Sequence, residues 1–144
     1  MSKETWAAVE HYYGGLLAPD DAALEYTLQS SEAAGMPRIQ VSALQGKLLH
    51  LLARMVAARN ILEIGTLGGY STIWMARALP EDGRLITLEA NQKHAEVARE
   101  NFVRAGVAGK IDLRLGKALD TLPQIAEEGR GPFDLIFIDA DRSN

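Results

Sequence analysis

Four short apolar runs alternate with segments of helical spacing through the second half of the chain. The runs are NILEIG, GRLITLEA, KIDLRLG and FDLIFIDA, and helical patterns cover residues 70–79, 91–105 and 117–128 between them. Apolar runs of this length, bounded by turn residues, indicate buried strands. Because strand and helix succeed each other regularly, right-handed crossover connections and a parallel sheet are favoured. The sequence therefore predicts an open α/β sheet with flanking helices.

Three further helices are expected ahead of this sheet. Apolar residues at helical spacing predict helices over residues 4–17 and 22–34, and a third helix from Ser42 onward. The third helix has a broad apolar stripe, so we expect it to pack on the sheet. A chain of 144 residues is enough for one core. We predict a single domain over 1–144, with N-terminal helices in 1–57 and a cofactor-binding α/β part in 60–144.

Composition removes several classes of partner and site. The net charge of −4 gives no electrostatic reason for binding DNA or an anionic membrane. The chain has no cysteine, which excludes disulfides, thiolate metal sites and a cysteine nucleophile. The first residues lack a continuous apolar segment, unlike a signal peptide or a membrane span. We expect a soluble protein with a cytoplasmic location.

A glycine-rich loop follows the first strand, in the stretch LEIGTLGGYS. Gly65 would let the chain turn while a ligand lies against its backbone, and Gly68 and Gly69 can take positive φ before the next helix. The N–H groups from Gly69 to Ser71, at the start of that helix, would attract a carboxylate or a phosphate. The alternative is a simple strand-to-helix turn in which Ser71 caps the helix.

The spacing of the loop bears on which cofactor it could bind. A dinucleotide fingerprint reads G-x-G-x-x-G, and this loop has no glycine at the middle position, so NAD is disfavoured. Glu89 ends the second strand, where its carboxylate could accept both hydroxyls of a ribose; otherwise it is a solvated carboxylate at a strand end. Gly116 and Ala118, after the third strand, are small enough for a flat adenine to lie beside them.

The fourth strand is followed by two aspartates, Asp139 and Asp141. Magnesium prefers oxygen ligands, and a carboxylate at a strand end is a candidate ligand. Such a pair also serves commonly as a helix cap or turn former. The three histidines, His11, His50 and His94, have no mutual spacing that suggests a metal site, and we assign them to surface or packing roles.

In their order along the chain, these motifs resemble a known family. The runs ILEIGTLGGYSTIWMARAL, ITLEAN, GKALDTLP and FDLIFIDAD are similar to those of the cation-dependent O-methyltransferases of the catechol and caffeoyl-CoA type, which use S-adenosylmethionine. The similarity covers about residues 36–142. It implies a Rossmann-like class I methyltransferase fold, with the C-terminal third and its strands missing from this chain. It also implies a homodimer and a small phenolic or catechol-like acceptor.

The resemblance assigns a role to each site residue. Val41 would contact the methionine part of the cofactor through its backbone, and Ser71 would bind the amino-acid carboxylate. Glu89 would hold the ribose hydroxyls. The other residues implied at the cofactor are Glu63, Gly65 and Thr66 along the cleft, Gly116 and Ala118 at the adenine, and Asp139 at the methionine end.

The resemblance also implies a metal-assisted reaction. Asp139 would be a catalytic residue and a ligand of a divalent cation, Mg²⁺ in the first instance. Arg142 occupies the position of a family lysine that is cast as the helper base, but a guanidinium stays protonated and would only hold negative charge. The further metal ligands of the family lie beyond Asn144. The alternatives are a catalytically incomplete fragment that binds the cofactor or dimerises, and an NAD-dependent oxidoreductase.

Overall fold

The computed structural model describes residues 2–140 and has the α/β architecture that the sequence predicts. Three helices come first, α1 (Lys3–Leu17), α2 (Ala22–Ala33) and α3 (Ala43–Met55). The strands and their connecting helices follow in the order β1 (Asn60–Ile64), α4 (Tyr70–Ala76), β2 (Arg84–Glu89), α5 (Gln92–Arg104), η1 (Ala108–Lys110), β3 (Ile111–Leu115), α6 (Ala118–Glu127) and β4 (Leu135–Ile138).

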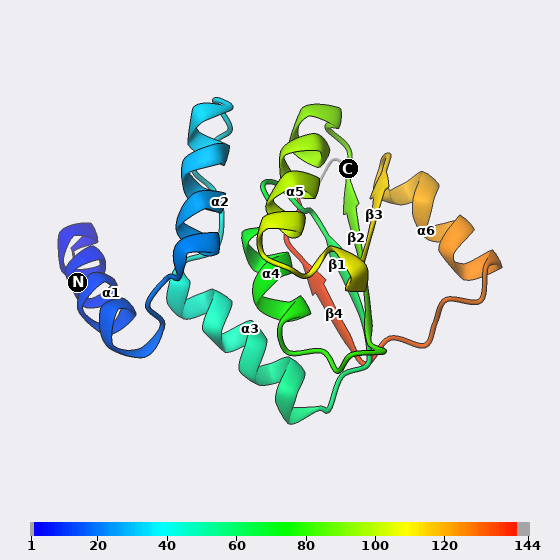
Figure 1. The fold of residues 1–144 in the computed structure, drawn as a ribbon, viewed down its shortest axis with the longest axis horizontal. Helices are drawn as coiled ribbons and strands as arrows, with labels where there is room; N and C mark the ends of the chain where they lie inside the picture. The colour runs from blue at the N-terminus through cyan, green and yellow to red at the C-terminus, as the bar shows by residue number, and fades with distance from the viewer. Residues whose placement is uncertain (1, 141–144) are drawn as a thin grey trace.

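All strand pairs are parallel, in the order β3-β2-β1-β4. The chain moves outward from β1 to β3 and then returns to the other side of β1 through β4 (Figure 1). The carboxylate of Asp134 fixes the start of β4, because it accepts hydrogen bonds from the backbone N–H groups of Arg59 (2.8 Å) and Asn60 (2.9 Å). Because β2 lies on one side of β1 and β4 on the other, the strand order reverses between β1 and β4, and open α/β sheets bind their ligands at such a point.

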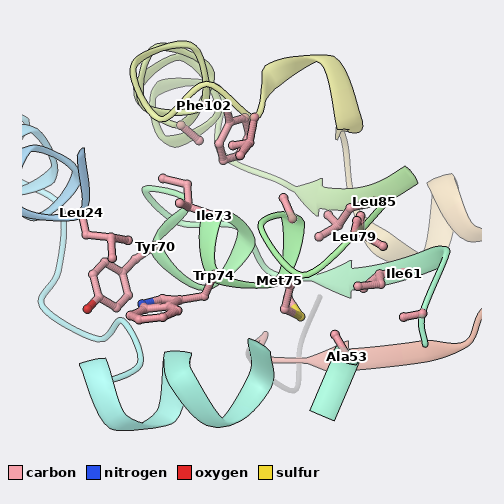
Figure 2. Close-up of a cluster of buried hydrophobic side chains, with 14 of the residues drawn as sticks. Leu24, Ala53, Ile61, Tyr70, Ile73, Trp74, Met75, Leu79, Leu85 and Phe102 are labelled. Atoms are coloured by element: carbon pink, nitrogen blue, oxygen red, sulfur yellow. The ribbon is translucent and has the colours of Figure 1, made fainter. Parts of the chain in front are cut away.

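Each face of the sheet carries its own core. Ile61 and Leu85 belong to a cluster with residues of α4 and α5, and Figure 2 shows this cluster gathered between the sheet and the helices. Leu62 and Ile86, one residue further along their strands, pack with α6 on the other face. Successive side chains of a strand point to opposite faces, so both faces need apolar residues. This explains the unbroken apolar runs in the sequence.

The N-terminal helices lie beside the sheet, and α1 is the one furthest from it (Figure 1). α2 packs against α4 and α5, while α1 has no buried residue and contacts α3. The expectation that α3 packs on the sheet is met in part: its main partner is α4, where Gly46 lies against the Trp74 ring, and its Ala53 belongs to the core cluster of Ile61 in β1. Much of its apolar stripe is exposed, including Leu51 and Met55.

β4 forms one edge of the described sheet, and its outward side chains Ile136 and Ile138 are 54% and 69% exposed. An exposed apolar edge strand offers unpaired backbone groups to another segment or chain. Among residues 2–140, no helix has both the length and the apolar character needed to cross a membrane.

Candidate cofactor site

A cavity of about 500 Å³ opens at the carboxyl ends of the strands, within the usual size range of small-molecule sites. It lies at the reversal of strand order and is lined by the strand exits, the glycine-rich loop, the start of α6 and the segment before α3. Most of the residues predicted from the sequence line it: Val41, Gly65, Thr66, Ser71, Glu89, Gly116, Ala118 and Asp139.

Glu63 does not line this cavity, contrary to the sequence-based expectation. Its side chain is fully buried, on the face of β1 that is covered by α4. The carboxylate accepts hydrogen bonds from the hydroxyls of Ser71 (2.6 Å), Thr72 (2.5 Å) and Thr87 (2.7 Å). These donors come from α4 and β2, so Glu63 joins three elements from behind the cavity wall. We call Glu63 and these three hydroxyls the carboxylate clamp.

The pKa of Glu63 in this clamp lies well above its ordinary value. Burial raises the pKa of Glu63 to about 7; the hydroxyl donors act in the opposite direction, and the charge of Asp139 raises the pKa further. Removal from water disfavours the ionised carboxylate, and the three hydrogen bonds compensate only partly. Glu63 therefore changes charge close to neutral pH while it stays enclosed in the protein.

Gly65 makes the turn out of β1, with a φ of 101°. A Cβ atom at this position would lie 2.2 Å from the backbone oxygen of Asp139. The close approach therefore comes from the neighbouring strand exit of this chain, which lets β1 and β4 leave the sheet side by side. Close approach by a ligand stays a prediction.

The rest of the glycine-rich loop differs from the expectation. Positive φ occurs at Leu67 (52°) and Gly69 (86°), and not at Gly68. Gly69 does not line the cavity, and its N–H donates to the carbonyl of Thr66 (2.9 Å), so it is not available to a ligand. A Cβ at Gly69 would meet the Phe102 ring at 2.4 Å. Packing against α5 and the positive φ both favour glycine at this position.

Glu89 is held in position before any ligand binds. One carboxylate oxygen accepts from the N–H of Leu67 (2.8 Å) and the other from the N–H of Asn91 (2.9 Å). A carboxylate oxygen can accept more than one hydrogen bond, so both oxygens keep capacity for a diol. His94 also lines the cavity, with its Nδ1 3.6 Å from Oε1 of Glu89, a position that the sequence did not indicate.

Asn101 is a second residue that the sequence did not reveal. It is fully buried on α5, accepts from the Ser30 hydroxyl of α2 (2.9 Å) and donates to the carbonyl of Gly68 (2.9 Å). This amide ties the glycine-rich loop to α2 and α5. Nothing in its sequence surroundings marks it, because an asparagine within a helical pattern is usually a surface residue.

Asp139 is exposed at the end of β4, and its N–H donates to the carbonyl of Ile64 (2.8 Å). In the part of the chain that the structure describes, no three His, Cys, Asp or Glu residues gather as a metal site would require. Magnesium in proteins is usually held by one or two carboxylates together with waters and substrate oxygens, and Asp139 is the one candidate ligand among the described residues, so the expected ion stays a prediction. Asp141 and Arg142 lie outside the described residues.

Comparison with known proteins gives consistent matches. A sequence family described as O-methyltransferase matches residues 18–144. A catechol O-methyltransferase from Niastella koreensis is 57% identical over 142 residues, which cover 99% of this chain and 64% of that relative.

Solved structures agree with these sequence matches. The O-methyltransferase from Bacillus cereus in complex with SAH has a TM-score of 0.94 at 55% identity, over 98% of this chain and 64% of that one. The O-methyltransferase TomG from Streptomyces achromogenes in complex with SAM has a TM-score of 0.93 at 49% identity, over 99% and 64% of the two chains. The chain thus spans 64% of the length of each of these relatives.

The raised pKa of Glu63 makes a prediction about stability. Below about pH 4.5 both the folded and the unfolded chain carry the proton; between there and about pH 7 only the folded chain does. The contribution of Glu63 to the free energy of unfolding is therefore full at acid pH and falls by about 3 kcal/mol as the pH rises through this window. Glu63→Gln, which has no proton to lose, should lack this fall.

Urea unfolding at pH 5 and pH 8 measures the effect. Glu127→Gln, which alters an exposed carboxyl on α6, is the matched control and should follow the wild type. Parallel pH profiles for the wild type and Glu63→Gln would contradict the assignment.

Proposed function

The chain belongs to the O-methyltransferase family, and on that premise we propose that it binds S-adenosylmethionine for methyl transfer to a hydroxyl of a small phenolic or catechol-like acceptor. One observation carries the proposal. Ser71 and Glu89, which are assigned to opposite ends of the cofactor, line the same cavity. Relatives that hold SAM or SAH support it, since the fold extends over almost the whole of this chain.

The cavity offers suitable chemistry to each part of the cofactor. The two oxygens of Glu89 would accept the ribose hydroxyls, in charge-assisted hydrogen bonds. Gly116 and Ala118 leave room for the adenine, and Ser71 with Val41 would contact the amino-acid end. Asp139 lies at the β4 exit, beside Gly65, where its charge would face the positive end of the cofactor.

Methyl transfer from a sulfonium needs little chemistry from the protein. The acceptor hydroxyl first gives its proton to solvent; the methyl group then moves in line from sulfur to the phenolate oxygen, S-adenosylhomocysteine leaves as the S–C bond breaks, and the opposite charges are neutralised. Catalysis then rests largely on alignment of the two reactants. The proposed task of this chain is to fix the sulfonium at the mouth of the cavity. Arg142 would hold negative charge on the acceptor oxygen, without removing its proton.

We propose no reaction step that uses a divalent cation. Asp139 is its one candidate ligand among the described residues, and a single carboxylate binds magnesium weakly. The incomplete fragment therefore stays a second candidate, in which the chain binds the cofactor without efficient turnover. The oxidoreductase alternative has no support, because the family and the relatives are methyltransferases.

Cofactor affinity tests the assignment of Glu89. Glu89→Gln keeps the shape of the side chain but removes its charge, so S-adenosylmethionine should bind about tenfold more weakly or worse. Titration calorimetry on the wild type and the variant measures the change. Glu96→Gln, an exposed carboxyl on α5, is the control and should bind as the wild type does. An unchanged affinity in Glu89→Gln would refute the ribose role.

Turnover separates the enzyme from the fragment. With catechol, S-adenosylmethionine and Mg²⁺, we expect this chain to be slower by at least about tenfold than the Niastella koreensis relative, because Asp139 is the one candidate metal ligand among residues 2–140. Cofactor binding by calorimetry is the parallel measurement, and it should succeed. Equal turnover by the two proteins would contradict the fragment alternative.

The proposal includes a homodimer. α1 buries none of its residues, and it presents Trp6, Tyr12 and Leu16 to solvent at 59%, 64% and 64% exposure. Large apolar patches commonly mark protein contacts. Sedimentation equilibrium at micromolar concentration should give twice the chain mass of 15.7 kDa, and Leu16→Glu should lower it towards one chain. A monomeric wild type would contradict the proposal.

A further inference from the structure

Ser71 connects the carboxylate clamp to the cavity. Its hydroxyl lies 2.6 Å from Glu63, and the same residue lines the cavity at the start of α4. Thr72 also donates to Glu63, at 2.5 Å, but it is fully buried and does not line the cavity. A ligand in the cavity can therefore reach the buried carboxylate through the hydroxyl of Ser71.

A hydroxyl has one proton to donate. While Glu63 is ionised, it accepts that proton from Ser71, because charge-assisted hydrogen bonds are the stronger ones. The side chain of Ser71 then offers a ligand only the lone pairs of its oxygen. A ligand carboxylate at this place would meet an acceptor, and behind it a second negative charge. The single hydroxyl proton of Ser71 cannot donate to both carboxylates.

A proton added to Glu63 removes this conflict. The protonated carboxyl would donate to the Ser71 oxygen across the same 2.6 Å contact, and Ser71 would turn its own proton towards the ligand. The hydrogen-bond chain would then run from Glu63 through Ser71 to the ligand carboxylate. No bond of the ligand is made or broken, and the added proton comes from the solvent.

We propose that Glu63 is a positioning residue for the amino-acid end of the cofactor, and that binding of the cofactor carboxylate at Ser71 takes up one proton onto Glu63. This inference rests on the proposed function, because it assumes that the adenosyl cofactor occupies the cavity. It adds that a residue outside the cavity sets the direction in which Ser71 donates. It also makes cofactor affinity depend on pH through Glu63.

The surroundings of Glu63 favour this exchange. α4 and β2 contribute the hydroxyls of Ser71, Thr72 and Thr87 to Glu63. Asp139, which follows β4 directly, is the charged group among the described residues that acts on it. Burial raises the pKa of Glu63 to about 7, and a second carboxylate nearby would raise this pKa further, which favours uptake of a proton on binding.

Calorimetry can count the proton. S-adenosylhomocysteine has the same amino-acid end as the cofactor, and its binding would be measured at pH 8 in phosphate and in Tris, whose heats of ionisation differ. We expect the wild type to take up roughly half a proton or more in excess of Glu63→Gln. The excess should vanish near pH 5.5, where the free protein already carries the proton. Any proton exchanged by the ligand amino group is common to both proteins and cancels.

Two hydroxyl variants form a matched pair that is independent of Glu63→Gln. Ser71→Ala removes the residue that links Glu63 to the cavity, so its proton uptake should fall to the level of Glu63→Gln. Thr72→Val removes another donor to the same carboxylate, but one away from the cavity, so its excess uptake should persist.

The outcomes separate this inference from the proposed function. Tight binding with equal proton uptake in the wild type, Ser71→Ala and Glu63→Gln would overturn the inference and indicate that Ser71 accepts from the ligand ammonium group. The proposed function would survive that result. Absence of binding by the wild type at every pH would overturn both.

Discussion

The hydrogen bonds from Ser71, Thr72 and Thr87 to the buried carboxylate of Glu63 organise the cofactor end of this protein. A carboxylate without partners could not be buried at this depth without a large free-energy cost. Because its partners come from α4 and β2, the carboxylate fixes how α4 starts relative to the sheet. The position of α4 in turn limits the conformation of the glycine-rich loop between β1 and α4. This loop forms part of the cavity wall.

Other contacts hold the loop in this conformation from outside. Glu89 of β2 accepts from the N–H of Leu67, and Asn101 of α5 donates to the carbonyl of Gly68. Leu67 adopts positive φ, which costs a non-glycine residue about 1–2 kcal/mol, and the hydrogen bond to Glu89 helps to maintain it. The residue proposed to hold the ribose is thus also part of the support of the loop. Binding and architecture use the same side chain.

The sequence predicted the fold well, because strand and helix periodicities depend on local spacing alone. Most of the site was also predictable, since strand exits of a parallel sheet meet at one edge. Glu63 was misplaced although side-chain alternation puts it on the same face as Ile61, the face covered by α4. His94 and Asn101 depend on how α5 turns over the loop, which no spacing reveals. The exposed stripe of α3 shows that periodicity predicts an apolar face but not its partner.

The central claim is that the strand exits, fixed by the clamp on Glu63, form one crevice for an adenosyl cofactor. A crystal structure of this chain with S-adenosylhomocysteine tests it most directly. The account predicts that the ribose hydroxyls lie on Glu89, that the carboxylate lies at Ser71, and that Glu63 remains buried behind it. A ligand bound elsewhere, or one turned so that its adenine lies at Ser71, would contradict the account.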